Sequence, residues 1–252
     1  MLRAESLAKR FGGVRAVEDL SLEVVPGSVH SIIGPNGAGK TTLLNLLSGI
    51  VRPDHGRILF EGREMQGAAP HRFAAAGIGR TFQNLQIFFN MSAAENVMAG
   101  GWLHQACGLA AAMLRPPRLA HAERRAREDA HALIEFVGLA RWADAPSDAM
   151  PYGALKRLEI ARALAARPKL LLLDEPAAGL NPTETREIDE LIRRIAERGI
   201  TVVLVEHNMK LVMEVSQRVL VLHEGRRLAE GDPRTVSADP AVVEAYLGAE
   251  HA

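Results

Sequence analysis

The first third of the chain changes its hydrophobic spacing once. Apolar residues first form short strand-like stretches, at residues 17–25 and 29–33. After Gly39 they recur three and four positions apart, which places them on one face of a helix: Leu43, Leu46, Leu47 and Ile50. Pro53 and Gly56 are expected to end this helix. The pattern therefore predicts a strand, a glycine-rich loop and a helix in succession.

The same alternation returns in the last third. Residues 170–173 are four consecutive leucines, which is typical of a strand buried on both faces of a parallel sheet. A helix with an apolar stripe and a second buried strand, residues 201–205, follow. The stripe consists of Ile188, Leu191, Ile192 and Ile195. Residues 218–222 and 226–230 indicate a hairpin, and residues 240–247 a short terminal helix. Strands alternating with helices predict a layered α/β core.

The middle of the chain has another character. Residues 92–166 are rich in Ala and Arg with helical spacing, and Arg115-Pro116-Pro117 interrupts them. We interpret this stretch as an inserted α-helical subdomain. Residues 1–91 and 167–252 then form the core, so that residues 1–252 make one domain with a helical insertion.

Composition limits the classes of protein that need to be considered. Of 252 residues, 48% are hydrophobic and 24% charged, as in soluble globular proteins. Lys plus Arg and Asp plus Glu both total 30, so no global basic field attracts nucleic acid. The single cysteine, Cys107, fits a reducing compartment and has no expected role. Phosphate binding, if present, must be local.

Membrane association is expected to depend on partners. The first five residues do not resemble a signal peptide. The longest apolar stretch, near residues 106–114, is much shorter than the roughly 20 residues of a membrane span. The chain is therefore predicted to lack a transmembrane segment and to be peripheral.

One motif indicates phosphate binding. The sequence G-x-x-x-x-G-K-[ST] is matched in full, after a predicted strand and before a predicted helix. Its residues are Gly34, Pro35, Asn36, Gly37, Ala38, Gly39, Lys40 and Thr41. Glycines let successive backbone N–H groups converge on phosphate oxygens, and the helix adds its positive end. Lys40 is placed for the β and γ phosphates, and the Thr41 hydroxyl for Mg²⁺.

A second motif supplies acidic chemistry. The leucine strand ends in Asp174-Glu175. Asp174 can hold Mg²⁺ through its water shell, and Glu175 can polarise the attacking water. A strand often ends in an acidic residue at a turn, so the pair is informative mainly together with the phosphate loop.

The order of these motifs resembles the nucleotide-binding subunit of ATP-binding cassette (ABC) transporters over nearly the whole chain. Further matching positions are Gln83, Met150 to Ala154, Ala178 to Asn181, and His207. The resemblance implies a P-loop NTPase core with a parallel sheet, an N-terminal antiparallel β subdomain and an inserted α-helical subdomain. It also implies ATP and Mg²⁺ as ligands.

The resemblance assigns roles to individual residues. Glu175 is the implied general base, Gln83 touches Mg²⁺ and the lytic water, and His207 contacts the γ phosphate. Phe11 is implied to stack on adenine with Val17 beside it, although a lone Phe is more often a core residue. The other implied nucleotide-binding residues are Thr42, Tyr152, Gly153 and Asn181, and the metal-binding ones are Thr41, Gln83 and Asp174.

Two segments depart from the family pattern. The signature, usually Leu-Ser-Gly-Gly-Gln, is here Met150-Pro151-Tyr152-Gly153-Ala154, so only the second glycine remains. Gly153 still permits close approach of backbone N–H groups, but the serine contact is gone. Asn181 stands where the family usually has Asp. This change removes a charge near the expected dimer seam.

The departures point to a subgroup. Pro151-Tyr152-Gly153, residues 177–182 and residues 206–209 are similar to the ATPase subunits of branched-chain amino-acid importers, and related subunits serve urea, amides or aromatic acids. The similarity also covers residues 80–96, the helical stretch 102–118 and the ending 244–248.

The resemblance also implies partners. These are integral membrane permease subunits, a second ATPase subunit, identical or paralogous, in a head-to-tail dimer, and indirectly a periplasmic or extracellular solute-binding protein. The implied location is the cytoplasmic face of the inner membrane. Residues 84–96 are a candidate groove for a permease helix, with Leu85, Gln86 and Ile87 as expected contacts, or they simply pack the helical subdomain.

Two alternative functions remain open. One is a soluble ABC ATPase that acts on nucleic acid or ribosomes. Such proteins usually carry two cassettes or a long coiled-coil insertion, which this sequence lacks, and nucleic acid is not an expected partner. The other is an exporter-type ATPase for lipid or polysaccharide, which only the subgroup resemblance opposes.

Overall fold

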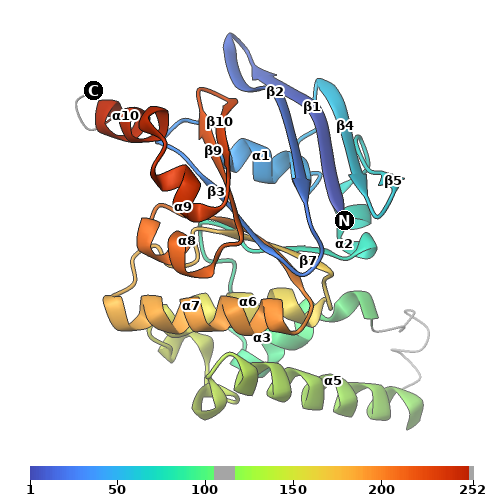
Figure 1. Ribbon diagram of the computed structural model, residues 1–252. Helices are drawn as coiled ribbons and strands as arrows, with labels where there is room; N and C mark the ends of the chain where they lie inside the picture. Colours follow the sequence, from blue (N-terminus) through green and yellow to red (C-terminus); the bar gives the residue numbers. More distant parts are fainter. Residues whose placement is uncertain (105–116, 250–252) are drawn as a thin grey trace. The chain divides into compact units, whose positions relative to one another are not determined.

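The computed structural model describes residues 1–104 and 117–249 (Figure 1). The chain forms two compact units, one of Met1–Arg80 with Lys169–Ala252 and one of Thr81–Pro168. The predicted helical insertion, residues 92–166, falls within the second unit. Cys107 and most of the stretch 102–118 lie outside the described residues. In the part of the chain that is described, no helix is long and apolar enough to cross a membrane.

A six-stranded sheet organises the first unit in the order β10-β9-β3-β8-β7-β6. Its strands are β3 (Val29–Ile33), β6 (Ile78–Arg80), β7 (Leu170–Asp174), β8 (Thr201–Val205), β9 (Arg218–His223) and β10 (Arg226–Gly231). All neighbours are parallel except β9 and β10, which form the predicted antiparallel hairpin. The central strands β3, β7 and β8 are buried along their whole length, as their continuous apolar sequences predict.

A four-stranded antiparallel sheet completes the strands of this unit (blue to cyan in Figure 1). It has the order β2-β1-β4-β5, with β1 (Leu2–Phe11), β2 (Val14–Val24), β4 (His55–Phe60) and β5 (Arg63–Glu64). This is the antiparallel β subdomain that the resemblance implies. The sequence pattern did not predict β1, because its apolar and polar residues do not alternate regularly. Its register shifts between Ala4 and Leu7, where Ser6 has a left-handed backbone (φ 46°).

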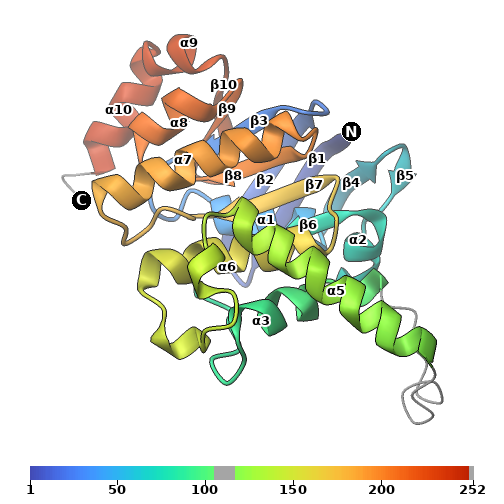
Figure 2. The same cartoon turned by 90° about the horizontal axis from the view of Figure 1, so that it is seen from below.

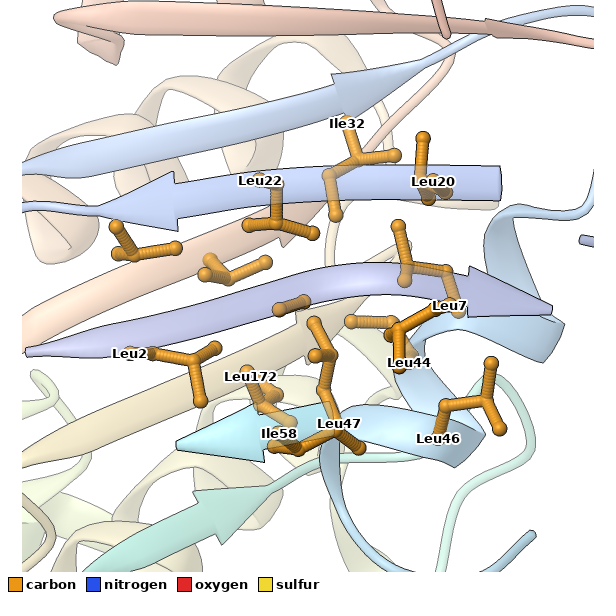
Figure 3. Close-up of a cluster of buried hydrophobic side chains, with 14 of the residues drawn as sticks. Leu2, Leu7, Leu20, Leu22, Ile32, Leu44, Leu46, Leu47, Ile58 and Leu172 are labelled. Carbon is orange, nitrogen blue, oxygen red and sulfur yellow. The ribbon is translucent and has the colours of Figure 1, made fainter. Parts of the chain in front are cut away.

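Helix α1 links the two sheets through its leucines. The helix spans Lys40–Leu47, and both sheets contribute to the same hydrophobic cluster as its side chains. Figure 3 shows Leu44 close to Leu7 of the antiparallel sheet, and Leu47 close to Ile58 of that sheet and to Leu172 of the six-stranded sheet. Burying each such leucine contributes about 1.5–3 kcal/mol. The helix that carries the phosphate loop is therefore fixed in the core.

The predicted end of this helix is wrong by one turn. Ile50 was expected on the buried face, but it is 44% exposed, because α1 ends at Leu47. Gly49 has φ 74°, and a Cβ there would lie 2.4 Å from the Phe73 ring. The Gly49 N–H donates to the Leu46 carbonyl oxygen (3.1 Å), so the helix ends at a local glycine cap, and Phe73 packs against that glycine.

The opposite face of the six-stranded sheet has its own helices. α7 (Pro182–Glu197) buries the predicted stripe of Ile188, Leu191, Ile192 and Ile195. α8 (Met209–Val215), α9 (Pro233–Ser237) and α10 (Pro240–Ala249) contribute Val212, Val236 and Val242 to a second cluster with Ile33 and Val221. Figure 2 shows these orange to red helices grouped together. A last helix of this unit, α2 (Pro70–Ala76), precedes β6.

The second unit is helical, as predicted. It contains α3 (Ala93–Gly100), α5 (Pro117–Phe136) and α6 (Tyr152–Ala165), with 3₁₀ turns at Trp102–His104, Ala140–Trp142 and Ser147–Ala149. Its core includes Ile134, Phe136 and Val137. Buried Asn96 orders the segment before α3, because its amide group bonds both backbone groups of Phe88 and the Ser147 hydroxyl.

Candidate nucleotide-binding site

The glycine-rich loop connects β3 to α1 and requires glycine where it passes other backbone. A Cβ on Gly34 (φ 150°) would lie 2.1 Å from the Leu222 carbonyl oxygen. A Cβ on Gly39 (φ 100°) would lie 2.2 Å from the Ala16 carbonyl oxygen. Both glycines also adopt left-handed backbone angles that other residues disfavour. The two glycines therefore allow the loop to pass in close contact with the backbone of β9 and of β2.

Lys40 begins α1 and turns its amino group back over the loop. Its Nζ donates hydrogen bonds to the carbonyl oxygens of Gly34 (2.8 Å) and Pro35 (2.9 Å), and the residue is 6% exposed. Burial lowers the pKa of Lys40, while the Glu175 and Asp174 carboxylates oppose that shift. The loop lysine and the acidic pair thus form one electrostatic group.

The N-terminus of α1 differs from most other helix starts in this unit. Asn181, Asn208 and Asp232 cap α7, α8 and α9 with side-chain oxygens. At α1 the cap residue is Gly39, and among the described residues no side chain caps the helix. Its first N–H groups have no partner inside the helix, and its dipole favours an anion there. The loop and this helix start together form a phosphate-type site.

Asp174 ends β7 and is held by an arginine that the motifs did not reveal. Arg80, at the end of β6, donates to Asp174 Oδ2 (3.1 Å), and both side chains are almost fully buried. The same guanidinium bonds Asn45 and Ser48 of the segment that begins with α1. Arg80 therefore joins the acidic strand to the helix of the phosphate loop. A buried ion pair in this place leaves no local mark in the sequence.

Glu175 and His207 meet at the ends of two adjacent strands. His207 Nε2 lies 2.8 Å from Glu175 Oε1. The Glu175 backbone N–H donates to the Val205 carbonyl oxygen of β8 (2.9 Å), and its φ of 49° is unusual for a non-glycine residue. Such backbone costs roughly 1–3 kcal/mol and persists only where the surrounding structure holds it. The carboxylate and imidazole that the motifs predicted are thus brought together.

The two predicted adenine-side residues have different environments. Phe11 ends β1 with 48% of its surface exposed, and the Lys9 amino group lies 5.4 Å from its ring centre. Val17 is 1% exposed and belongs to the hydrophobic core. Phe11 is therefore available to a flat ligand, whereas Val17 is explained by packing alone.

The second unit contains the remaining predicted residues. Gln83 follows β6 by three residues, and its carbonyl oxygen accepts from Lys156 Nζ of α6 (3.3 Å). Glu159 of the same helix accepts from the Phe82 N–H (3.3 Å). Burial raises the pKa of Glu159, and this hydrogen bond opposes the shift. The segment around Gln83 is thus attached to the helix that starts at the signature.

The atypical signature still starts a helix. Pro151 is the N-cap residue of α6 and makes no side-chain cap bond, so the N-terminus lacks the hydroxyl that a serine would place there. Gly153 is buried in the first turn, and Tyr152 is 47% exposed. The Tyr152 ring lies 5.7 Å from the Lys156 amino group. An exposed aromatic residue and an open helix start lie side by side in this unit.

Asn181, which stands where the family usually has Asp, caps the N-terminus of α7. Its side-chain oxygen accepts from the N–H groups of Thr183 (2.9 Å) and Glu184 (3.0 Å), and Glu184 bonds back to the Asn181 N–H (3.0 Å). This is a complete capping box for α7, followed by Pro182 in the first turn. Asn and Asp cap equally well, so the substitution leaves the helix start intact.

Replacing Asn181 with alanine is expected to lower stability by about 0.5–2 kcal/mol, the usual cost of losing such a cap. For a protein of this size, each kcal/mol lowers the melting temperature by about 2–4 °C. Thermal unfolding followed by circular dichroism measures the shift. Asn181→Asp is the matched control and should melt within about a degree of the parent protein, because it keeps the capping oxygen. Equal melting of the alanine variant would contradict the capping role.

A cavity of about 610 Å³ lies between the phosphate loop, the β9–β10 hairpin and α10. The loop residues 35–38, the β9–β10 turn at His223 and Glu224, and α10 at Ala241, Glu244 and Ala245 line it. Tyr246 of α10 packs with the second cluster, and burial raises the pKa of its hydroxyl. The C-terminal helix is therefore part of the surroundings of the loop.

A largely parallel sheet, a glycine loop leading from β3 into an uncapped helix, and an acidic pair at the end of β7, with β8 between these two strands, define a P-loop nucleotide-binding protein. Residues 17–178 match the family model "ABC transporter" and residues 226–252 the model "Branched-chain amino acid ATP-binding cassette transporter". The chain belongs to the ABC transporter family, as an ATP-binding cassette.

Three relatives show how far the similarity extends. The chain is 43% identical over 249 residues to the high-affinity branched-chain amino acid transport ATP-binding protein BraF of Pseudomonas aeruginosa, covering 98% of both chains. It is 41% identical over 249 residues to LivG of Escherichia coli K12, a protein of the same description, again covering 98% of both chains. A solved ATP-binding cassette of an ABC transporter in its ADP conformation superposes with a TM-score of 0.86 at 32% identity, covering 98% of both chains.

Proposed function

We propose that this protein is the ATP-hydrolysing subunit that powers an ABC importer for branched-chain amino acids. The similarity to BraF and LivG along nearly the whole chain carries this proposal. The C-terminal match at residues 226–252 supports it independently of the general cassette motifs. The exporter alternative also has a relative, the lipopolysaccharide export system ATP-binding protein LptB of Acidithiobacillus ferridurans, at 37% identity over 248 residues. BraF and LivG are more similar to the chain, and the C-terminal match favours the importer.

The chemistry assigned to this site is phosphoryl transfer to water. The phosphate loop and Lys40 bind the phosphates, and Glu175 acts as general base on the attacking water. His207 contacts the γ phosphate while bonded to Glu175, and Phe11 stacks on the adenine. The distance of 2.8 Å between His207 and Glu175 supports their acting as a pair.

Mg²⁺ fits the oxygen donors of this site. The Thr41 hydroxyl at the start of α1 and the Asp174 carboxylate at the end of β7 are hard oxygen ligands of the kind that Mg²⁺ prefers. Gln83 is the third proposed contact. When bound, the ion neutralises charge on the phosphates. Arg80 keeps Asp174 oriented by the hydrogen bond to its Oδ2 atom.

The working form is proposed to be a head-to-tail dimer bound to permease subunits. The exposed Tyr152 and the start of α6 with Gly153 are the features that would face ATP on a second cassette. The proposed permease groove, residues 84–96, has exposed Gln86, Phe88 and Phe89, a half-buried Leu85 and a buried Ile87. A solute-binding protein would deliver the amino acid to the permease, at the cytoplasmic face of which the ATPase lies.

Two measurements test this proposal. The tagged chain, purified from detergent-solubilised membranes, is expected to bring two polytopic membrane proteins and a second ATPase, as identified by mass spectrometry. Cells lacking the chain are expected to lose high-affinity leucine uptake, and the parent chain but not Lys40→Ala should restore it. Recovery only with ribosomes or DNA, or unchanged leucine uptake, would contradict the importer assignment.

A further inference from the structure

Glu206 is a buried carboxylate next to the proposed active site. It follows β8 directly, precedes His207, and is 3% exposed. Its two oxygens accept hydrogen bonds from three backbone N–H groups: Ala177 (2.8 Å), His207 (3.1 Å) and Asn208 (3.4 Å). A buried carboxylate is costly unless it is bonded in this way. The sequence motifs used His207 and gave Glu206 no role.

The two oxygens of Glu206 bind different parts of the chain. Oε1 accepts from Ala177, two residues after Glu175. Oε2 accepts from the loop that contains His207. Because this single side chain holds both segments, it fixes the backbone that supports Glu175 relative to the backbone that supports His207.

Only a carboxylate satisfies this arrangement. Backbone N–H groups are donors, so both side-chain oxygens must accept. A glutamine of the same shape has one accepting oxygen and one donating NH₂ group. Its NH₂ group would face either the Ala177 N–H or the His207 N–H, and one of the two segments would lose its attachment.

Helix capping does not explain Glu206. α8 already has an N-cap, since the Asn208 side chain accepts from the Leu211 N–H (3.2 Å). The bond from Ala177 crosses to a segment that is not part of α8 at all. The contacts of Glu206 instead connect the segment that follows Glu175 with the loop that contains His207.

We propose that Glu206 is a positioning residue for ATP hydrolysis, whose carboxylate keeps the His207 imidazole within hydrogen-bond distance of Glu175. This inference rests on the proposed roles of Glu175 and His207. Glu206 is 3% exposed and both its oxygens are bonded to backbone N–H groups, so it is not expected to touch ATP or the attacking water. It acts through the backbone of the two segments, so its removal should affect the chemical step and leave nucleotide binding unchanged.

The test is Glu206→Gln in the full-length chain, measured together with His207→Ala and the double variant. Glu206→Gln is expected to lower kcat about tenfold, with ATP affinity from calorimetry within twofold of the parent, since a transition-state interaction is lost. In the His207→Ala background the same change should have no further effect on kcat. Glu214→Gln, an exposed carboxylate of α8, is the matched control and should keep the parent kcat.

Two results would overturn the inference. One is a kcat of Glu206→Gln within twofold of the parent, and the other is an equal loss in the parent and His207→Ala backgrounds. If Glu206→Gln fails to fold by circular dichroism, Glu206→Asp is used, which keeps two accepting oxygens, and a kcat equal to that of a folded Glu206→Ala variant would overturn the inference. Failure of the proposed function is distinguishable: unchanged leucine uptake would contradict the importer while ATP turnover persists, and a parent-like kcat of His207→Ala would contradict the role of His207.

Discussion

Lys40→Ala is expected to lower ATP affinity by about 100-fold, because charge-assisted hydrogen bonds to phosphate contribute roughly 3 kcal/mol. Turnover should fall below detection at millimolar ATP. The lysine is buried above the phosphate loop, where its amino group already bonds two loop carbonyl oxygens. In the proposed role, its amino group is thus already held over the loop before the phosphates bind. Isothermal titration calorimetry with ATP measures the loss of affinity.

The control for this experiment is Lys169→Ala. Lys169 forms an exposed ion pair with Glu61, and such surface pairs contribute about 0–1 kcal/mol. This variant should bind ATP like the parent protein. Thermal unfolding of Lys40→Ala is needed as well, because the carbonyl groups of Gly34 and Pro35 lose their donor. An Ala variant that is folded and retains ATP affinity would show that residues 34–41 do not form the nucleotide site.

Local signals in the sequence were sufficient for the phosphate loop and the acidic strand. The glycines and Lys40 lie together in residues 34–41, and the leucines lie together in residues 170–173. Within each segment the spacing reports backbone conformation and burial directly. The structure places the loop between β3 and α1 and Asp174 at the end of β7, as predicted. The hairpin of β9 and β10 was also predicted from its alternation and turn.

Long-range contacts were beyond such reasoning. Arg80 and Asp174 are 94 positions apart, and Glu206 and Ala177 are 29 apart, so no spacing rule connects them. The strand β1 was missed because the left-handed Ser6 interrupts its alternation. The end of α1 was misplaced because the glycine cap at Gly49, a local signal, was not used. For the two buried carboxylates the deciding neighbour comes from elsewhere in the chain, whereas the interruption of β1 and the end of α1 are local.

Glu175→Gln is expected to bind ATP with the parent affinity and to lower kcat by about 10²–10⁴-fold, the usual contribution of a general base. Glutamine has the same shape and retains a hydrogen-bond partner for His207, whose Nε2 lies 2.8 Å from Glu175. It lacks only the ability to accept a proton from water. Calorimetry and a phosphate-release assay separate the two effects.

Glu190→Gln is the matched control, since Glu190 is an exposed carboxylate of α7. A Glu175→Gln turnover within threefold of the parent would remove Glu175 as the base.

The variant also separates catalysis from assembly. If ATP joins two cassettes, Glu175→Gln should elute as a dimer in ATP and as a monomer in ADP during size-exclusion chromatography, because bound ATP persists. Lys40→Ala should remain monomeric in both nucleotides, because without bound phosphates nothing favours the dimer. Slow turnover with no ATP-dependent dimer would retain the catalytic role of Glu175 and contradict the head-to-tail arrangement.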